Sequence, residues 1–240
     1  MSPLHGKTAL VTGASGAIGR ATALALAARG AGLVLSARDP ARLEETASRA
    51  ASLGVTTATL ARDLTDEGAL DELFALLQDR FGGADLLVHA LGIYASGSVA
   101  TTPVSELDRQ LRVNLRVPYL LTQLLIPSLI ARRGQVVFVN SSAALRPRGT
   151  VAAYASSKAA LAALASALRD EVNPAGVRVL SIFPGRTASP MQEEVHRLEG
   201  EAYDPARLLQ PAAVAAAIVA ALELPDSAEV TDLHIRPMRK

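Results

Sequence analysis

Short apolar runs alternate with longer amphipathic stretches along most of this chain. Each run is bounded by turn residues, which is typical of strands that are buried on both faces of a parallel sheet. We expect strands at 8–11, 32–36, 55–60, 84–90, 135–140, 177–183 and 230–235. Helical spacing predicts helices at 17–28, 41–53, 67–81 and 211–224, a helical stretch around Asn114, and a long helix from Tyr154.

The regular alternation of strands and helices with short turns predicts a single α/β domain over residues 1–240, a parallel sheet wound with helices on both faces. Only residues 186–210 break the pattern. Because a loosely patterned insert after a strand end is typical of a lid, we expect this segment to cover a substrate site.

Composition narrows the possible partners of the chain. Half of its 240 residues are hydrophobic and the formal net charge is +1, so neither nucleic acid nor an anionic membrane is expected as a partner. The absence of cysteine excludes disulfides and thiolate metal sites, and we expect no metal. With no pattern of a signal peptide and the longest apolar run near 212–222, we expect a cytoplasmic protein.

The first strand runs into a glycine-rich turn, Thr12-Gly13-Ala14-Ser15-Gly16-Ala17-Ile18-Gly19, that opens a helix. In this context glycines let the backbone approach a pyrophosphate, and the helix N-terminus offers free N–H groups. The alternative is a tight turn without a ligand.

The end of the second strand carries Ser36 and Arg38. No carboxylate stands there to repel a 2′-phosphate, whereas a hydroxyl and a guanidinium are available to bind one. This favours NADP(H) over NAD(H), although Arg38 is alternatively a solvated loop charge. Asp39 lies near the spacing expected of a ribose-binding acid, but Asp39-Pro40 reads as the start of a helix.

Further candidates follow the third and fourth strands. Asp63 either accepts a hydrogen bond from an adenine amino group or caps the next helix. Gly92 permits a ribose to approach the backbone closely. Within the next helical stretch, Pro118 cannot donate to the carbonyl of Asn114, which is then free for water or a lysine, or simply marks a kink.

Tyr154 and Lys158 are four residues apart, so a helix places them on one face. A positive charge at ~4 Å would lower the phenol pKa by about 3 units, from about 10 to about 7. The pair then suits proton transfer. An exposed pair without function has the same spacing.

Together these motifs resemble the short-chain dehydrogenase/reductase family over nearly the whole chain. The glycine loop is similar to TGxxx(A/G)xG, and Pro184-Gly185 with Thr187 resembles the PG motif. The family's catalytic tetrad is matched in order and approximate spacing by Asn114, Ser142, Tyr154 and Lys158.

The resemblance implies a Rossmann fold with strand order 3-2-1-4-5-6-7 and a homodimer or homotetramer. It also implies that Tyr154 transfers the proton, that Ser142 rather than Ser141 binds the substrate carbonyl, and that Lys158 lowers the Tyr154 pKa. Asn114 would hold a water molecule. The implied cofactor contacts are Gly13, Ser15, Gly16, Ile18, Gly19, Ser36, Arg38, Asp63, Leu64, Ala90, Gly92, Tyr154, Lys158, Pro184, Gly185 and Thr187.

The expected function is an NADP(H)-dependent oxidoreductase acting on a small carbonyl or secondary alcohol. Two alternatives are a non-catalytic NADP(H)-binding sensor or scaffold on the same fold, and a sugar-nucleotide epimerase or dehydratase. One departure from the family is His89-Ala90-Leu91-Gly92 in place of NNAG, where we interpret His89 as structural. Arg146, Arg148 and Arg186 are either solvated or bind an anionic substrate.

Overall fold

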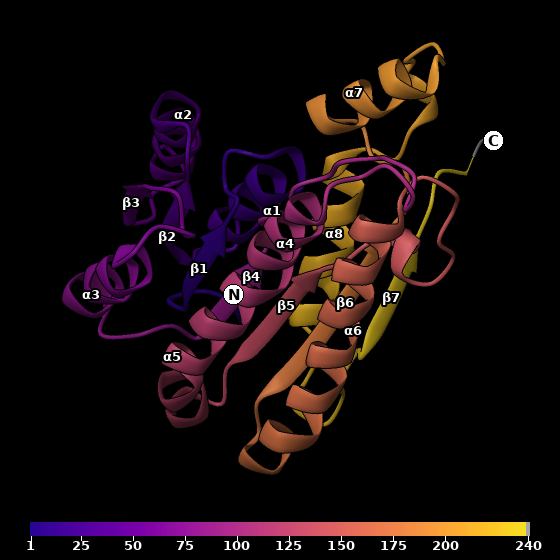
Figure 1. Ribbon diagram of the computed structural model, residues 1–240. Helices are drawn as coiled ribbons and strands as arrows, with labels where there is room; N and C mark the ends of the chain where they lie inside the picture. The colour runs from indigo at the N-terminus through magenta and orange to yellow at the C-terminus, as the bar shows by residue number, and fades with distance from the viewer. Residues whose placement is uncertain (239–240) are drawn as a thin grey trace.

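Seven parallel strands form one sheet in the order β3-β2-β1-β4-β5-β6-β7 in the computed structural model, which describes residues 1–238 (Figure 1). The strands are β1 (Thr8–Thr12), β2 (Gly32–Ala37), β3 (Thr57–Ala61), β4 (Leu86–His89), β5 (Gln135–Val139), β6 (Arg178–Pro184) and β7 (Asp232–Ile235). Every neighbouring pair is parallel. The expected fold class and strand order are therefore confirmed.

Helices cover both faces of the sheet. One face packs against α1 (Ala17–Ala27), α2 (Pro40–Ala51) and α8 (Pro211–Leu222), and the other against α3 (Ala69–Phe81), α5 (Val117–Arg132) and α6 (Ala152–Val172). Along β1, Ala9 and Val11 belong to the first core and Leu10 to the second. Because side chains alternate between two cores, both faces of the strand must be apolar.

The helical stretch around Asn114 is broken as the sequence predicts. It consists of α4 (Val104–Leu111), a π-helical turn η1 (Arg112–Arg116) and α5. Pro118 has no N–H for the Asn114 carbonyl, and the Val117 N–H bonds instead to the Arg112 carbonyl, five residues back. A π-turn of this kind is frequent at functional sites.

The joined helix Val104–Arg132 is longer than any apolar segment expected from the sequence. By length and composition alone it meets the criterion for a membrane-crossing helix, as the core helices of soluble proteins also do. Its residues Leu121 and Leu125 are buried in the core against the sheet. Packing on the sheet therefore accounts for its apolar face.

Helix α6 is only partly covered. Leu161, Ala165 and Leu168 are buried, whereas Ala159 and Ala163 are exposed. The sheet thus covers one face of α6 and leaves the other exposed in the single chain.

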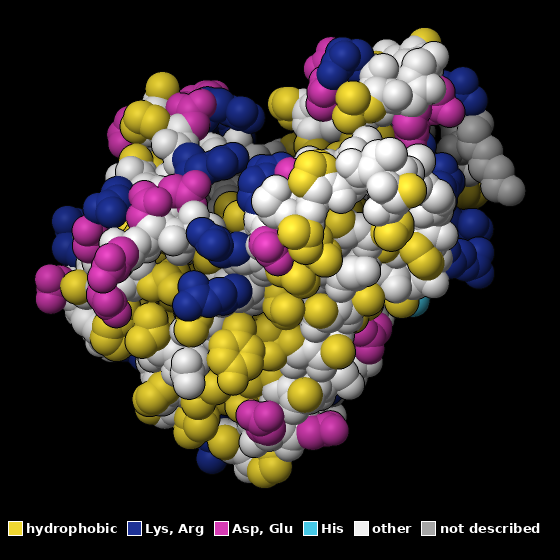
Figure 2. All heavy atoms as spheres, viewed as in Figure 1, with side chains coloured by type: hydrophobic (Ala, Val, Ile, Leu, Met, Phe, Trp, Pro, Cys, Tyr) yellow, Lys and Arg dark blue, Asp and Glu magenta, His cyan; other side chains and the backbone are white. Residues whose placement is uncertain are grey.

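The insert after β6 folds as a small unit closed at its base. A bridge joins Thr187 to Leu209, and the Leu209 N–H donates to the Arg186 carbonyl at 3.0 Å. Between these points lie α7 (Pro190–Glu199) and the short helix η4 (Pro205–Arg207). In Figure 1, α7 stands beyond the sheet, and Figure 2 shows the surface notched between α7 and α2.

Candidate active site

The glycine loop packs directly against the carboxyl end of β4. Gly13 has φ +67°, and a Cβ there would lie 2.6 Å from the Ala90 carbonyl oxygen. A Cβ on Gly19 would lie 2.2 Å from the Gly13 carbonyl oxygen. Because the N-cap of α1 is Gly16, which has no side chain, the first N–H groups of this helix are open to an anion. The loop therefore fits the pyrophosphate of a dinucleotide.

A hollow of about 20 Å³ lies beside this loop at the ends of β2 and β3. Five predicted cofactor residues line it together: Gly13, Ser36, Arg38, Asp63 and Leu64. Four more were missed: Ala37, Arg62, Leu91 and Val113. Each of the four adjoins a residue that the sequence singled out, so position next to a strand end or to Asn114 was the available signal.

Ser36 is fully buried, and its Oγ has no hydrogen-bond partner among residues 1–238. A buried hydroxyl without a partner is costly unless a ligand or water satisfies it. Arg38, which is exposed, lies 3.9 Å from the Asp63 carboxylate. The Ser36 hydroxyl without a partner and the exposed Arg38 guanidinium thus both border this hollow.

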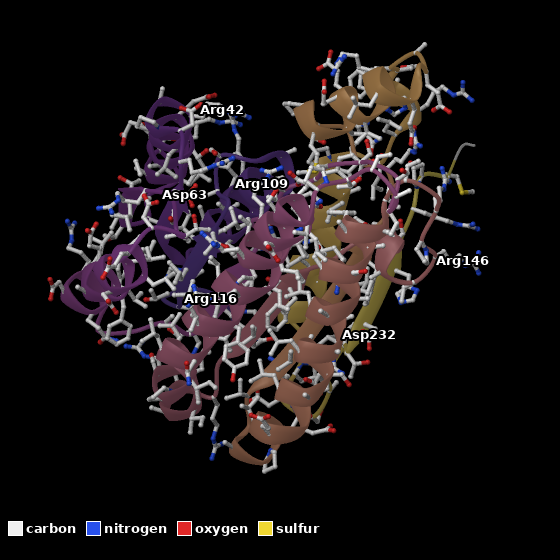
Figure 3. All side chains as sticks on the ribbon, viewed as in Figure 1. Arg42, Asp63, Arg109, Arg116, Arg146 and Asp232 are labelled. Carbon is white, nitrogen blue, oxygen red and sulfur yellow. The ribbon has the colours of Figure 1, made fainter. Side chains whose placement is uncertain are left out.

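Asp63 makes a local turn instead of capping α3. Its Oδ1 accepts from the Thr65 N–H at 2.9 Å and from the Thr65 hydroxyl at 2.8 Å. Burial alone would raise the Asp63 pKa, but the Thr65 hydrogen bonds and the Arg38 charge lower it below its ordinary value. Figure 3 shows Asp63 on the β1–β3 side and Arg109 on α4. Asp39, by contrast, caps α2 as expected, accepting from the Arg42 N–H at 3.1 Å.

Tyr154 meets Ser141 rather than the expected Ser142. The Tyr154 hydroxyl hydrogen-bonds the Ser141 side chain, which also accepts from the Ala143 N–H at 3.1 Å. Ser142 is exposed and begins the 3₁₀-helix η2 (Ser142–Ala144). Ser141 is the extended N-cap residue just before this turn, and its side chain is the one that bonds the Tyr154 phenol. The structure therefore replaces Ser142 by Ser141 beside the phenol.

Lys158 lies one turn after Tyr154 on α6, as the spacing predicts, and is buried. Its Nζ donates to the Val139 carbonyl at 3.0 Å, and burial lowers its pKa to about 8. The Tyr154 pKa is raised, because burial outweighs the hydrogen bond from Ser141 and the Tyr94 phenol adds to the rise. The expectation that Lys158 lowers the Tyr154 pKa is therefore not met, since the Lys158 ammonium is directed to a carbonyl at the end of β5.

Asn114 fastens the loop after β4. Its Oδ1 accepts from the Ile93 N–H at 2.8 Å, and its Nδ2 donates to the Ile93 carbonyl at 3.0 Å and to the Ser157 hydroxyl at 2.9 Å. Gly92 comes just before, where a Cβ would lie 3.4 Å from the Lys158 Nζ and 3.5 Å from the Asn114 Oδ1. Asn114, Lys158 and Gly92 are thus brought together.

His89 connects β4 to α5 in place of the family's amide. Its Nε2 forms a hydrogen bond with the Thr122 hydroxyl at 2.9 Å. Its ring stacks on the Phe138 ring, with the two ring centroids 4.9 Å apart. Burial, with the Lys158 charge, lowers the His89 pKa to about 3. A neutral, fully buried ring of this kind supports the structural interpretation.

The remaining predicted cofactor positions border the same edge. Pro184 ends β6, the Gly185 N–H donates to the Ile235 carbonyl at 2.8 Å, and the Thr187 hydroxyl donates to the Gly185 carbonyl at 2.9 Å. Ile18 and Ala90 pack on the core, and Ser15 is half-buried in the glycine loop.

The three loop arginines differ in their surroundings. Arg186 is paired with Glu199 at 2.5 Å and with Glu201 at 3.2 Å, so its charge is already balanced. Arg146 and Arg148 are exposed, and Figure 3 shows Arg146 at the outer edge of the molecule. Within residues 1–238, no group of three His, Asp or Glu side chains is placed to hold a metal ion.

The geometry agrees with a match to a known family. The family described as short chain dehydrogenase matches residues 7–200. The chain belongs to the short-chain dehydrogenase family. This dehydrogenase is 34% identical over 236 residues to an uncharacterized short-chain type dehydrogenase/reductase of Sinorhizobium fredii, across 96% of this chain and 91% of the relative.

Two similar solved structures hold different nicotinamide cofactors. An NAD⁺-bound xylitol dehydrogenase has a TM-score of 0.89 at 27% identity, covering 98% of this chain and 99% of the other. An alcohol dehydrogenase from the archaeon Thermococcus sibiricus, complexed with 5-hydroxy-NADP, has a TM-score of 0.88 at 27% identity, covering 98% and 97%. The protein is an oxidoreductase of this family, and its cofactor preference has to be argued from its own residues.

Proposed function

We propose that this short-chain dehydrogenase is an NADP(H)-dependent carbonyl reductase or alcohol dehydrogenase with Tyr154 as its general acid/base. The observation that carries the proposal is the hydrogen bond between Tyr154 and Ser141, with the buried Lys158 one turn further along α6. A protein that only binds the cofactor has no need of a hydroxyl pair placed for proton transfer.

In this proposal the substrate oxygen lies between the Ser141 and Tyr154 hydroxyls. Ser141 donates a hydrogen bond to the carbonyl oxygen, and Tyr154 gives it a proton in reduction or removes one in oxidation. Lys158, with a pKa of about 8, exchanges protons near neutral pH and can resupply Tyr154. Asn114 holds the loop against which Lys158 is packed. A nicotinamide cofactor held there would supply the hydride that, with the proton from Tyr154, turns the carbonyl into an alcohol, and would itself be oxidised.

The preference for NADP(H) is supported by the end of β2. There the buried Ser36 hydroxyl has no partner among the described residues and the Arg38 guanidinium is exposed, both on one hollow. A 2′-phosphate would satisfy both groups with charge-assisted hydrogen bonds. The glycine loop would hold the pyrophosphate, and Lys158 with Tyr154 the nicotinamide ribose.

Two structural roles complete the proposal. The segment 186–210, closed at its base by the Thr187–Leu209 bridge, would act as a lid over the substrate. The exposed face of α6, with Ala159 and Ala163, would be covered by a second copy of the chain in a homodimer or homotetramer. All of this belongs to one domain spanning residues 1–240.

The test measures the oxidation of NADPH, through its absorbance, in the presence of a panel of ketones and aldehydes. We expect turnover by the wild type and a loss of about 10²–10⁴-fold in kcat for Tyr154→Phe. That variant should still be stabilised clearly by NADPH, because the glycine loop, Arg38 and Lys158 remain to hold the cofactor, which shows that the site is intact. A shift without turnover on any carbonyl or alcohol would instead identify a cofactor-binding sensor.

A further inference from the structure

Tyr94 lies where three segments of the carboxyl edge meet. Its ring contacts the Tyr154 ring edge-on, with centroids 5.1 Å apart. Three residues later, the Gly97 N–H donates to the Thr150 carbonyl at 2.7 Å and joins the loops after β4 and β5. The Glu199 and Arg186 charges at the lid also act on the Tyr94 hydroxyl, whose pKa is raised mainly by burial. Tyr94 therefore borders the reacting phenol on one side and the lid on the other.

The polar side chains of the lid are largely paired with one another. Arg186 is held by Glu199 and Glu201, and the Gln192 amide is 3.2 Å from the His196 ring. The Tyr203 hydroxyl accepts from the Ser189 N–H at 3.1 Å. Because these groups already have partners, a polar substrate would have to share or displace those contacts on binding.

The apolar side chains of the same three segments are exposed instead. Val99 follows β4, Leu145 follows β5, and Met191 and Leu198 lie on α7, where Leu198 is 50% exposed. Figure 2 shows hydrophobic side chains on the edge of α7 nearest the notch. Exposed apolar groups on the segments that border a site are typical of a surface that a ligand covers.

Resting on the proposed function, we propose that the substrate is an apolar ketone or aldehyde, or the matching alcohol. Its alkyl or aryl body lies against Tyr94 and the apolar residues of α7 while its oxygen reaches Tyr154. A sugar or polyol is disfavoured, because each of its buried hydroxyls needs a partner and the polar groups of the lid are already engaged with one another.

The first experiment is kcat/KM with NADPH for methyl ketones of increasing chain length and for ketoses of equal carbon number. Full burial of a methylene predicts an increase of about fourfold per CH₂. Ketoses should be poorer substrates than alkanones of the same length. A flat series, or ketoses that react faster, would overturn the apolar assignment while leaving the oxidoreductase proposal intact.

Substitutions with matched controls test whether the substrate body lies against Tyr94 and the apolar residues of α7. Leu198→Ser should reduce the gain per CH₂ to about twofold, since the terminal methylenes then lose an apolar neighbour. The control is Leu53→Ser, which changes a leucine of the same 50% exposure at the opposite edge of the sheet and should leave the series unchanged. Tyr94→Phe keeps the ring and should retain the preference, whereas Tyr94→Ala should weaken it. Equal series for the Leu198 and Leu53 variants would contradict the placement on α7.

Binding without turnover separates this inference from the proposed function. In Tyr154→Phe with NADP⁺, ligand-observed NMR with 2-alkanols should show affinity that rises with chain length. That result supports the apolar surface even if no carbonyl is reduced by the wild type, which would refute the oxidoreductase proposal alone. Affinity that is independent of chain length would refute the apolar surface.

Discussion

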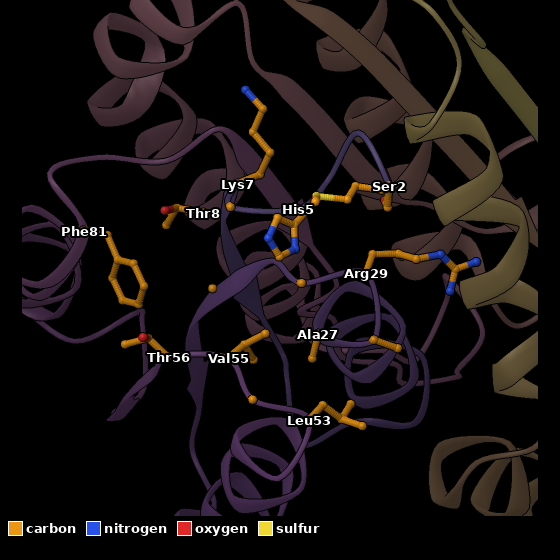
Figure 4. Close-up of a pocket in the computed structure, with 16 residues that line it drawn as sticks. Ser2, His5, Lys7, Thr8, Ala27, Arg29, Leu53, Val55, Thr56 and Phe81 are labelled. Atoms are coloured by element: carbon orange, nitrogen blue, oxygen red, sulfur yellow. The ribbon is translucent and has the colours of Figure 1, made fainter.

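The two ends of the sheet differ in the size of their hollow and in the polar groups that lie there. At the amino ends of β1 to β3 lies an open hollow of about 610 Å³, lined by His5, Leu53 and Phe81 among others (Figure 4). At the carboxyl ends of the same strands the hollow is only about 20 Å³. Yet the smaller hollow lies beside the glycine loop and the free Ser36 hydroxyl, and the Tyr154–Ser141 pair lies on the same edge.

The charged groups of the larger hollow already have structural partners. Lys7 pairs with Asp85 at 3.0 Å, and Arg29 pairs with Glu223 at 3.3 Å. At the carboxyl edge, helix N-termini and strand ends converge, which is where open α/β sheets bind ligands. In this fold, polar groups without structural partners therefore identify a ligand-binding site better than the volume of a hollow does. Substitutions at the two ends should therefore separate stability from activity.

The largest effect is expected at the amino end, from Asp85→Ala. The buried Asp85 carboxylate accepts from the Lys7 ammonium, the Thr8 N–H at 2.9 Å and the Arg132 guanidinium at 3.2 Å. Removing it takes the anionic partner from two cations and leaves the buried Thr8 N–H unpaired, which should lower the free energy of unfolding by about 3–5 kcal/mol, measured in urea.

The matched control at the same end is Glu223→Ala, which breaks the Arg29 pair at the surface and should cost less than about 1 kcal/mol. Folded Asp85→Ala should bind NADPH as the wild type does. Equal losses in the free energy of unfolding from the two substitutions would contradict the different roles of the two ends. Weaker NADPH binding by folded Asp85→Ala would contradict them as well.

At the carboxyl end, Ser141→Ala should reduce kcat/KM by about 10²–10³-fold, because the substrate oxygen loses a placed hydrogen-bond donor. Ser142→Ala should change it by less than about threefold, as loss of a solvated hydroxyl has little effect. Steady-state kinetics with NADPH and a methyl ketone measures both. The reverse order would restore Ser142 as the carbonyl-binding residue.

These two serines show where sequence reasoning reaches its limit. The apolar runs placed all seven strands, and the strand ends brought Gly13, Ser36, Arg38 and Asp63 to one hollow. Such positions follow from topology, because parallel strands end at a common edge. The choice between Ser141 and Ser142 depends on where the 3₁₀ turn begins, because its extended N-cap residue, Ser141, is the one that meets Tyr154. Likewise, the pKa directions of Tyr154 and Lys158 depend on burial, which spacing alone does not give.

A third prediction concerns the cost of burying Lys158. Its pKa is about 8 in the folded chain against an ordinary 10.5, so between these values the unfolded chain binds more protons and stability rises with pH. The rise amounts to about 3 kcal/mol in total. Below pH 8 the ammonium is buried at a cost, and Lys158→Met should be more stable than the wild type although inactive.

Urea unfolding of the wild type and Lys158→Met from pH 7 to about 10 tests this. The raised Tyr154 pKa acts in the opposite direction only above about pH 10, where an unfolded tyrosine begins to lose its proton. If the free energy of unfolding changes with pH in the same way for the two proteins, burial of the Lys158 ammonium does not destabilise the fold. The polar site at the carboxyl end would then have no stability cost.

The smallest effect separates two exposed arginines near opposite ends of α2. Arg38, at the end of β2, lines the small hollow, whereas Arg49 lies in the last turn of α2, away from it. Arg38→Ala should weaken NADPH binding relative to NADH by about tenfold, as expected for one exposed charge-assisted contact to a phosphate. Arg49→Ala should leave the NADPH/NADH ratio unchanged in the same calorimetric titrations. If both variants lose NADPH affinity equally, the preference comes from general positive charge, and the hollow at the carboxyl end no longer explains it.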